Sequence, residues 1–205
     1  MILKRVFDFI VSAVALLLLL PAFLMLALAI KLDSPGPVFY RGVRVGRFGK
    51  PFRIYKFRSM VVDAEKKGAA STSNEDMRVT NVGHFIRRFK FDELSQLINV
   101  FLGDMSFVGP RPEVQKFVDM YTDEEAQILN LRPGITDWSS IRFHNEGEII
   151  AASGIADADE AYMKLIRPEK LRLQIKYARE RTFLTDLEII FTTVSSLFST
   201  RLGKG

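Results

Sequence analysis

Apolar residues dominate the start of the chain and then give way to shorter alternating and helical patterns. Residues 9–30 carry no charge, and Ser12 is their only polar side chain. A helix of this length extends for about 33 Å, close to the thickness of the hydrocarbon core of a bilayer. Pro21 removes the hydrogen bond to the carbonyl of Leu17, which predicts a kink or a break. The pattern therefore predicts a bent helix in a membrane segment, residues 1–33.

Three interpretations of this segment stay open at the level of the residues. A transmembrane helix tolerates a proline, whereas a re-entrant helix bends at Pro21 and returns to the same face. A cleaved signal peptide is favoured by Lys4, Arg5 and the small residues around Leu28, but the apolar run is long for one and Lys31 follows at once. Because cations flank both ends, orientation is not determined. Membrane association is the shared prediction.

Two runs with strand character follow the apolar segment. Residues 38–45 and 52–60 are separated by a turn at residues 47–50, which predicts a β-hairpin. Residues 34–62 contain no acid but seven cations, and these form either a solvated face or a patch on lipid head groups and phosphates. They are Arg41, Arg44, Arg47, Lys50, Arg53, Lys56 and Arg58.

Helical spacing predominates in the remainder. Residues 63–80 are polar and predict a mobile loop, whereas residues 92–102 and 113–130 predict helices. A last helix carries an apolar stripe that fits either the core or the membrane interface: Leu187, Ile190, Phe191, Val194, Leu197 and Phe198. The predicted fold is mainly α with a small β-hairpin (α+β), in which the membrane segment precedes one further domain, residues 34–205.

Composition narrows the chemistry. Of the 205 residues, 48% are hydrophobic, and the net charge of +5 suits an anionic partner. The absence of cysteine excludes a disulfide, a thiolate nucleophile and a cysteine-bound metal. The two histidines lie far apart in the sequence, so any metal would be a hard cation held by oxygen ligands. A homodimer stays open, because an apolar stripe serves a core, a membrane or a partner equally well.

One acidic pair stands out from the others. Asp92 and Glu93 begin a predicted helix, where an aspartate also serves as a simple N-cap. Three features favour a phosphate site: Arg87, Arg88 and Lys90 precede the pair, a helix N-terminus attracts anions, and Arg111 lies between two prolines further on. A carboxylate in such surroundings can attack phosphorus and form an acyl phosphate, with cations and magnesium neutralising the charge. No P-loop, GxGxxG or GxSxG pattern occurs.

Several motifs occur in a fixed order along nearly the whole chain. They are Ser34-Pro35-Gly36-Pro37-Val38-Phe39, Tyr55-Lys56-Phe57-Arg58-Ser59-Met60, Phe91-Asp92-Glu93-Leu94-Ser95-Gln96-Leu97-Ile98-Asn99-Val100, Gly103-Asp104-Met105-Ser106-Phe107-Val108-Gly109-Pro110-Arg111-Pro112 and Arg132-Pro133-Gly134-Ile135-Thr136. This series resembles the bacterial sugar transferases known as small monotopic phosphoglycosyl transferases.

The resemblance implies a catalytic role for the pair. The family's aspartate, here Asp92, attacks the β-phosphate of a UDP-sugar, releases UMP and holds the phosphosugar covalently. Polyprenol phosphate, in bacteria undecaprenyl phosphate, then accepts it, which initiates the synthesis of a glycoconjugate. The family requires Mg²⁺, and its dyad glutamate, here Glu93, helps Asp92 bind it.

The resemblance also implies phosphate-binding residues and a location. These residues match the family's binding cations: Arg87, Arg111, Lys56 and Arg58. The membrane helix of the family re-enters at a proline that matches Pro21. The catalytic domain and its amphipathic interfacial helices are therefore expected on the cytoplasmic face of the bacterial inner membrane, against the phospholipid bilayer.

The chain departs from the family's usual pattern at a few positions. Ser95 replaces a usual proline, Leu20 replaces a usual serine, and residues 137–140 replace a usual Gly-Trp-Ala-Gln run. The last change falls in a loop expected to shape the sugar pocket, so the sugar is not identified. The alternative function is a membrane-tethered basic binding module without catalysis, for anionic lipid or nucleic acid; with the resemblance we expect no nucleic-acid partner.

Overall fold

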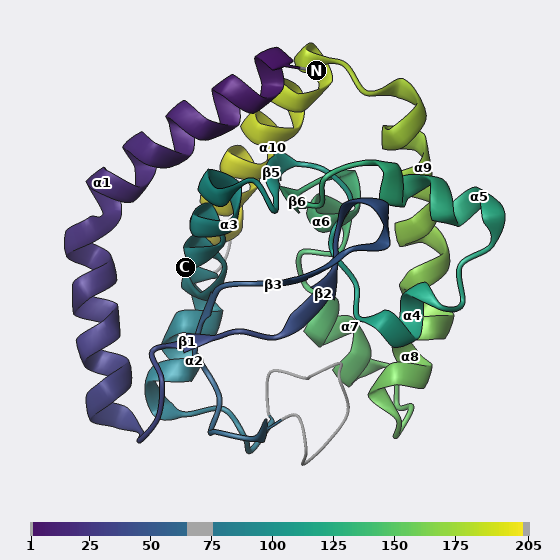
Figure 1. Cartoon of the computed structure of the whole chain (residues 1–205). Coiled ribbons are helices and arrows are strands. Elements are labelled where there is room, and N and C mark those ends of the chain that lie inside the picture. The colour runs from purple at the N-terminus through teal and green to yellow at the C-terminus, as the bar shows by residue number, and fades with distance from the viewer. Residues whose placement is uncertain (1, 65–75, 203–205) are drawn as a thin grey trace.

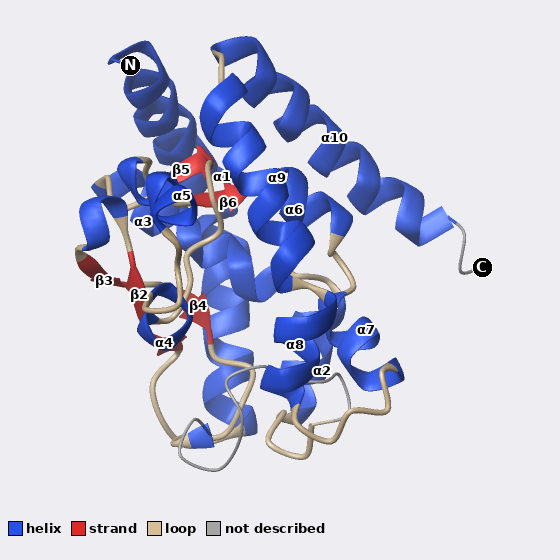
Figure 2. Cartoon of the chain, turned by 90° about the vertical axis from the view of Figure 1, so that its right-hand side faces the viewer, coloured by secondary structure: helices blue, strands red, loops and turns tan. Residues whose placement is uncertain are grey.

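The computed structural model describes residues 2–64 and 76–202, with side chains up to residue 196 in the last helix. In these residues helices predominate and strands are short, which confirms the predicted mainly α fold with a small β-hairpin (Figures 1 and 2). The central residues of the predicted loop, 65–75, lie outside the described part. The α-helices are α1 (Ile2–Asp33), α2 (Asn81–Arg88), α3 (Leu97–Leu102), α4 (Gln115–Val118), α5 (Asp123–Ala126), α6 (Trp138–Arg142), α7 (Glu146–Ala152), α8 (Ala158–Leu165), α9 (Arg167–Glu180) and α10 (Phe183–Leu202).

Short strands pair two by two. The segments β1 (Phe39–Tyr40) and β2 (Val43–Val45) run antiparallel to β4 (Lys56–Phe57) and β3 (Pro51–Arg53), respectively, and together form the predicted hairpin. A 3₁₀ turn, η1 (Arg47–Gly49), connects its two arms. Further along, β5 (Ser106–Val108) pairs in parallel with β6 (Gly134–Thr136).

Helix α1 is long, apolar and largely uncovered. It continues through Pro21, and its ribbon bends along its length in Figure 1, so the structure shows a bend rather than a break. In the described part of the chain it is the one helix long and apolar enough to cross a membrane. Leucines such as Leu17 and Leu18 are 73% and 76% exposed. Apolar surface of this extent indicates membrane association.

Polar contacts attach the first turns of α1 to the body. The Lys4 ammonium donates to the carbonyl of Val108 at 2.9 Å and to the Asp186 carboxylate at 2.5 Å. The Arg5 guanidinium donates to two carbonyls at the end of α3, at 2.6 and 2.8 Å. The buried Asp8 accepts a hydrogen bond from the backbone N–H of Phe107 at 3.2 Å. These contacts fix α1 against α3, β5 and α10.

The other end of α1 is held by Arg58. This buried guanidinium donates to the carbonyls of Ser34 and Pro35, just after the helix, at 2.7 and 2.8 Å, and to the carbonyl of Ile30 in its last turn at 3.4 Å. Nearby, Phe23 of α1 packs edge-to-face on Phe57 of β4, with ring centroids 5.0 Å apart. The C-terminal half of α1 is thereby packed on the hairpin.

The predicted helix over residues 92–102 is present only in part. Its first half is a 3₁₀ helix, η3 (Phe91–Gln96), and only the second half is α-helical, as α3. Lys90 precedes it in the left-handed conformation, with φ of 57°. The Ser95 hydroxyl donates to the carbonyl of Asp92, three residues earlier, at 3.1 Å. This side-chain bond to the backbone favours the tighter turn.

The predicted helix over residues 113–130 is wrong. The structure has three short pieces instead: α4, α5 and a 3₁₀ helix, η4 (Gln127–Asn130). Thr122 is extended and caps a new helix, because its hydroxyl accepts from the Glu125 N–H while the Glu125 carboxylate accepts from the Thr122 N–H. A capping box of this kind begins a new helix at Thr122, although the helical spacing of apolar residues continues through this position.

The last helix exposes much of its predicted apolar stripe. Leu187, Phe191 and Val194 are 39%, 73% and 47% exposed, while Ile189 is buried in the core. Core packing is therefore wrong for those three positions, and the membrane interface stays open for them. The side chains of Leu197 and Phe198 lie outside the described part. Figure 2 shows α10 extending along one side of the body toward the C-terminus.

Candidate active site

A cavity of about 580 Å³ holds most of the predicted site residues. Its volume lies within the range typical of small-molecule sites. One end is lined by charged groups: Lys56, Arg87, Lys90, Asp92, Glu93 and Arg111. The wall continues over apolar residues to helix α10, where Ile190 and Val194 line it. The cavity therefore joins a charged end to the exposed apolar helix.

Two buried side chains bring the hairpin to the acidic pair. The Asn99 side chain accepts from the Tyr55 N–H at 2.8 Å and donates to the carbonyl of Arg53 at 3.0 Å. The Ser95 hydroxyl lies 3.1 Å from the carbonyl of Tyr55 as well as from that of Asp92, so its one hydrogen is shared between the two acceptors. Because side chains alternate along a strand, Phe57 then points into the core and Lys56 toward η3. Sequence reasoning missed both Ser95 and Asn99.

Glu93 and Arg111 form the main ion pair of the charged end. The Arg111 guanidinium donates to both carboxylate oxygens of Glu93, one of them at 3.3 Å, and Lys56 lies 3.3 Å from Oε1. Burial alone would raise the pKa of Glu93, but Arg111 and Lys56 outweigh it and hold that pKa well below its usual range. Glu93 is therefore ionised and oriented, and it raises the pKa of Arg111 in turn.

Asp92 is in a different electrostatic position from its neighbour. Its closest cation is Lys56, whose ammonium lies 3.7 Å from Oδ2. Oδ1 is buried and has no hydrogen-bond partner in the part of the chain that the structure describes. Burial raises the pKa of Asp92, and neither Lys56 nor the more distant cations offset it. Asp92 is thus a poorly solvated carboxylate whose charge its neighbours do not fully compensate.

Arg87 and Lys90 complete the cationic lining around Asp92. Arg87 lies in the last turn of α2, where its Nε donates to the Ser59 hydroxyl at 3.1 Å. Burial lowers the pKa of its guanidinium. Lys90 reaches the cavity from the left-handed turn before η3, a conformation that redirects the chain between the two helices. With Lys56 and Arg111 these side chains supply four positive charges against two carboxylates.

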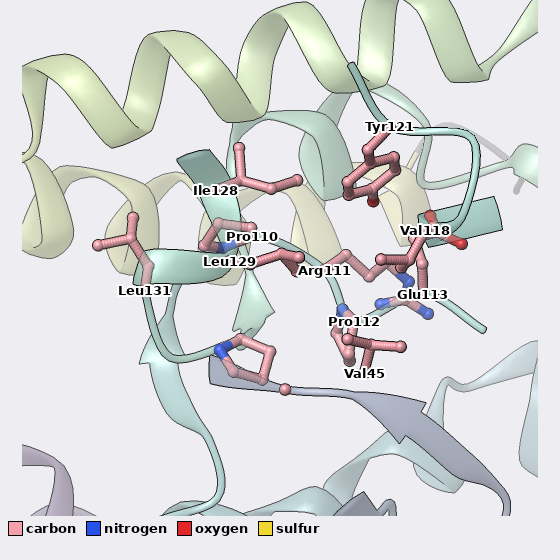
Figure 3. A pocket seen from close by; sticks show the side chains of 12 residues that line it. Val45, Pro110, Arg111, Pro112, Glu113, Val118, Tyr121, Ile128, Leu129 and Leu131 are labelled. Atoms are coloured by element: carbon pink, nitrogen blue, oxygen red, sulfur yellow. The ribbon is translucent and has the colours of Figure 1, made fainter. Parts of the chain in front are cut away.

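Arg111 lies in a rigid turn between two prolines. Figure 3 shows Arg111 between Pro110 and Pro112, with Val45 of the hairpin on one side and Tyr121 and Ile128 on the other. The hollow behind it measures only about 20 Å³, so the turn is closely packed. The neighbouring turns cross without room for side chains, because a Cβ on Gly134 would lie 2.1 Å from the Gly109 nitrogen. The two prolines and this close crossing fix the backbone position from which the Arg111 side chain extends.

The remaining predicted residues lie elsewhere. Arg58 is not among the residues that line the cavity, because its guanidinium is bound to the carbonyls at the end of α1. Its placement gives a structural role and does not support the expected phosphate contact. Pro21 lies within α1. The structure therefore brings together Lys56, Arg87 and Arg111 around the Asp92–Glu93 pair.

Comparison with known proteins identifies the family. The family model described as "Bacterial sugar transferase" matches residues 1–200. The chain belongs to the bacterial sugar transferase family. Curated members similar to it include a UDP-N-acetylgalactosamine-undecaprenyl-phosphate N-acetylgalactosaminephosphotransferase of Aeromonas hydrophila, 38% identical over 96% of this chain. A UDP-glucose:undecaprenyl-phosphate glucose-1-phosphate transferase of Escherichia coli is 39% identical over 94%, and one of Caulobacter vibrioides is 38% identical over 96%.

These sugar transferases differ in length. The chain spans 44% of the Aeromonas protein and 39% of the Escherichia coli protein, but 70% of the Caulobacter protein. The described residues contain no group of three or more acidic, histidine or cysteine side chains that could hold a metal ion by themselves.

The opposite pKa shifts of the acidic pair predict opposite effects on stability. A raised pKa means that ionised Asp92 destabilises the folded state at neutral pH, so Asp92→Asn should raise the melting temperature. The expected rise is about 2–4 °C for each kcal/mol gained in the free energy of unfolding. A lowered pKa means that ionised Glu93 stabilises it, so Glu93→Gln should lower the melting temperature. Thermal unfolding in detergent at pH 7.5 measures both.

The same scans at pH 4 provide the control. There the unfolded chain begins to bind a proton at Glu93, and the stabilisation is lost from this pH down to the lowered pKa of the folded state, so the difference between Glu93→Gln and the unmodified chain should begin to shrink. A fall in melting temperature for both variants at pH 7.5 would contradict this electrostatic account.

Proposed function

We propose that this chain transfers a sugar 1-phosphate from a UDP-sugar to polyprenol phosphate, most directly undecaprenyl phosphate. The products are UMP and a polyprenol-diphosphate sugar, the first intermediate of a glycoconjugate. The activities for which the relatives are named support the substrate classes. The observation that carries the proposal is the incompletely compensated carboxylate of Asp92, which lines a cavity whose other charges are mostly cationic.

Asp92 acts as the nucleophile in this proposal. An oxygen of its carboxylate attacks the β-phosphorus of the donor, and the bond from that phosphorus to the bridging oxygen breaks, so UMP leaves with the bridging oxygen. The sugar phosphate stays on Asp92 as an acyl phosphate. A phosphate oxygen of the polyprenol phosphate then attacks the same phosphorus, which releases the Asp92 carboxylate. Poor solvation of Asp92 favours the first step, because little water must be removed before attack.

The surrounding cations stabilise the charge of the diphosphate. Arg111 presents a planar fork that suits phosphate oxygens, and Arg87 and Lys56 approach Asp92 from other elements. Glu93 holds both Arg111 and Lys56 in place before any ligand binds. Prepositioned charges need no rearrangement during the reaction, which is the main electrostatic advantage of an enzyme over water.

Magnesium is part of the proposal as a cofactor. Mg²⁺ commonly binds through one or two carboxylates together with substrate phosphate oxygens, and the adjacent Asp92 and Glu93 offer that donor set. The unpartnered Oδ1 of Asp92 fits such a ligand. When bound there, the ion would neutralise charge on the donor diphosphate.

The lipid acceptor places the protein at a membrane. Exposed apolar side chains of α1 and α10 provide the contact surface, and Ile190 and Val194 connect α10 to the cavity. A polyprenol chain can therefore remain in the bilayer while its phosphate enters the charged end. We propose a re-entrant α1 that is bent at Pro21, with the catalytic domain on the cytoplasmic face of the bacterial inner membrane.

The reaction is tested by the release of UMP. Detergent-purified protein with UDP-sugars, Mg²⁺ and undecaprenyl phosphate should release UMP, and Asp92→Asn should reduce the rate by about 10³-fold or more, because no acyl phosphate can form. Asp119→Asn, at an exposed position outside the cavity, is the matched control. Incubation without acceptor should add the mass of one sugar phosphate to the unmodified chain.

Other outcomes separate the alternatives. Release of UDP instead of UMP would show direct glycosyl transfer, and UMP release by Asp92→Asn would eliminate Asp92 as nucleophile. No nucleotide release, with salt-dependent binding to anionic vesicles alone, would favour the basic binding module. Removal of Mg²⁺ with a chelator should stop UMP release, and added Mg²⁺ should restore it.

The raised pKa of Asp92 predicts the acid limb of activity. Only the ionised carboxylate attacks, so activity should fall as pH decreases through a pKa above that of an ordinary aspartate. Lys56 lowers the pKa of Asp92, so Lys56→Met should shift this limb to higher pH. The pH profile of kcat measures the shift. Lys50→Met, at an exposed position outside the cavity, should leave the limb unchanged, and an unmoved limb in Lys56→Met would contradict the assignment.

The re-entrant topology is tested by cysteine labelling, since the chain has no native cysteine. Ile2 and Leu32 are exposed near the two ends of α1, and Leu18 is exposed near its middle. In inner-membrane vesicles, Ile2→Cys and Leu32→Cys should both react with a charged maleimide from the cytoplasmic face, whereas Leu18→Cys should not react. Labelling of the two ends from opposite faces would show a spanning helix.

A further inference from the structure

A second polar cluster lines the same cavity away from Asp92. It consists of Glu113, Glu146, Tyr162 and Lys170, which come from four different segments. The Lys170 ammonium lies 2.6 Å from Glu113 and 3.8 Å from Glu146. The Tyr162 hydroxyl donates to Glu113 at 2.6 Å and accepts from Lys170 at 3.1 Å. Side chains that the proposed reaction does not use are thus closely organised.

Arg111 connects this cluster with the reacting end. Glu113 follows Arg111 after one proline, and both Glu146 and Glu93 act on the charge of the Arg111 guanidinium. Pairwise contacts thus connect the two groups of side chains: Lys56 contacts Asp92 and Glu93, Glu93 contacts Arg111, and Lys170 contacts Glu113 and Glu146. A ligand bound through its phosphates near Arg111 would have its adjoining ring beside the second cluster.

The charge of the cluster suits a neutral ligand. Two carboxylates face one ammonium within the cluster, and Arg44 and Arg111 are the other cations near it that line the cavity, so the cluster is less positive than the reacting end, where four cations accompany two carboxylates and attract phosphate. Glu113 stays ionised, because Lys170 outweighs the burial that would raise its pKa. Carboxylates, an ammonium and a phenol together offer both acceptors and donors, which a ring with several hydroxyl groups requires. Val114, Phe117 and Phe143 supply apolar wall around them.

We propose that Glu113, Glu146, Tyr162 and Lys170 form the subsite that binds the hydroxyl groups of the donor's sugar ring and determines which sugar is accepted. This inference rests on the proposed function. The cluster lies deep in the cavity, which suits the sugar better than the ribose of the nucleotide. UMP must leave after the first step, whereas the sugar phosphate stays bound. Lys170 and Tyr162 are among the least exposed residues of the cavity, at 5% and 3%.

A neighbouring cluster of similar composition, with one carboxylate instead of two, provides a comparison. Seven residues after Lys170 along the same face of α9, the Tyr177 hydroxyl donates to Asp186 at 2.6 Å, and the Lys4 ammonium lies 2.5 Å from the same carboxylate. Neither Tyr177 nor Asp186 lines the cavity, so this cluster only joins helices. A purely structural role for the first cluster would make the two respond alike to loss of their carboxylate.

The test compares the selectivity of Glu113→Gln and Glu146→Gln with that of Asp186→Asn. Release of UMP is measured with UDP-glucose, UDP-galactose and their two N-acetylated counterparts, and kcat/KM of the best donor is divided by that of its C4 epimer. We expect this ratio to fall about tenfold or more in the cavity variants and to stay unchanged in Asp186→Asn. Glu146 is partly exposed, so Glu146→Gln keeps the test valid where Glu113→Gln fails to fold.

Three outcomes would overturn the subsite. The first is an equal loss of kcat/KM for all four UDP-sugars. The second is an inhibition constant of UDP that rises by the same factor as the KM of the donor, because the cluster would then bind the ribose. The third is an equal change of the ratio in Asp186→Asn. The same comparison can be made without turnover. The increase in melting temperature with each UDP-sugar is measured relative to the increase with UDP. Absence of UMP release from the unmodified chain would therefore contradict the proposed function alone.

Discussion

The bidentate pair between Glu93 and Arg111 is the interaction around which the cavity is organised. Without Glu93, Arg111 and Lys56 would be two cations in a poorly hydrated space with no common anchor. With it, each is held at a fixed place, and Asp92 is left as the carboxylate that no cation fully compensates. Glu93 thus stabilises the arrangement, whereas the ionised form of the adjacent Asp92 is disfavoured by incomplete solvation. That division explains why two adjacent acids serve different purposes.

The scaffold transmits this arrangement through backbone contacts. The hairpin brings in Lys56 because Asn99 and Ser95 bind the backbone around Tyr55, and the same hairpin approaches the Arg111 turn where the Val45 N–H donates to the carbonyl of Glu113 at 2.9 Å. Elements that are far apart in sequence therefore meet at the cavity without long strands or a large sheet. Short, irregular pieces suffice because buried polar side chains, rather than an extended ladder, fix their positions.

Local patterns predicted what depends on neighbouring residues. The apolar helix and the hairpin follow from runs and turns, and Arg87 and Arg111 follow from their positions near the acidic pair, whereas Lys56 was placed there only by the resemblance to the family. Arg58 shows the limit, because its motif gives no sign that its partners are the carbonyls after α1. Lys170 was missed for a similar reason, since a lysine in a charged helix looks solvent-exposed until Glu113 is brought to it. Thr122 shows that a single cap can override helical periodicity.

The attachment of α1 to the body has a mechanical consequence. Lys4, Arg5 and Asp8 bind α1 to β5, α3 and α10 by directional bonds, and Arg58 holds its other end. The helix therefore cannot slide along its axis independently of the cavity. A change in the tilt of α1 would instead be passed on to β5, α3, α10 and the hairpin together, because the directional bonds at both ends move with it. The orientation of this one apolar helix is thereby coupled to the orientation of the charged cavity as a whole.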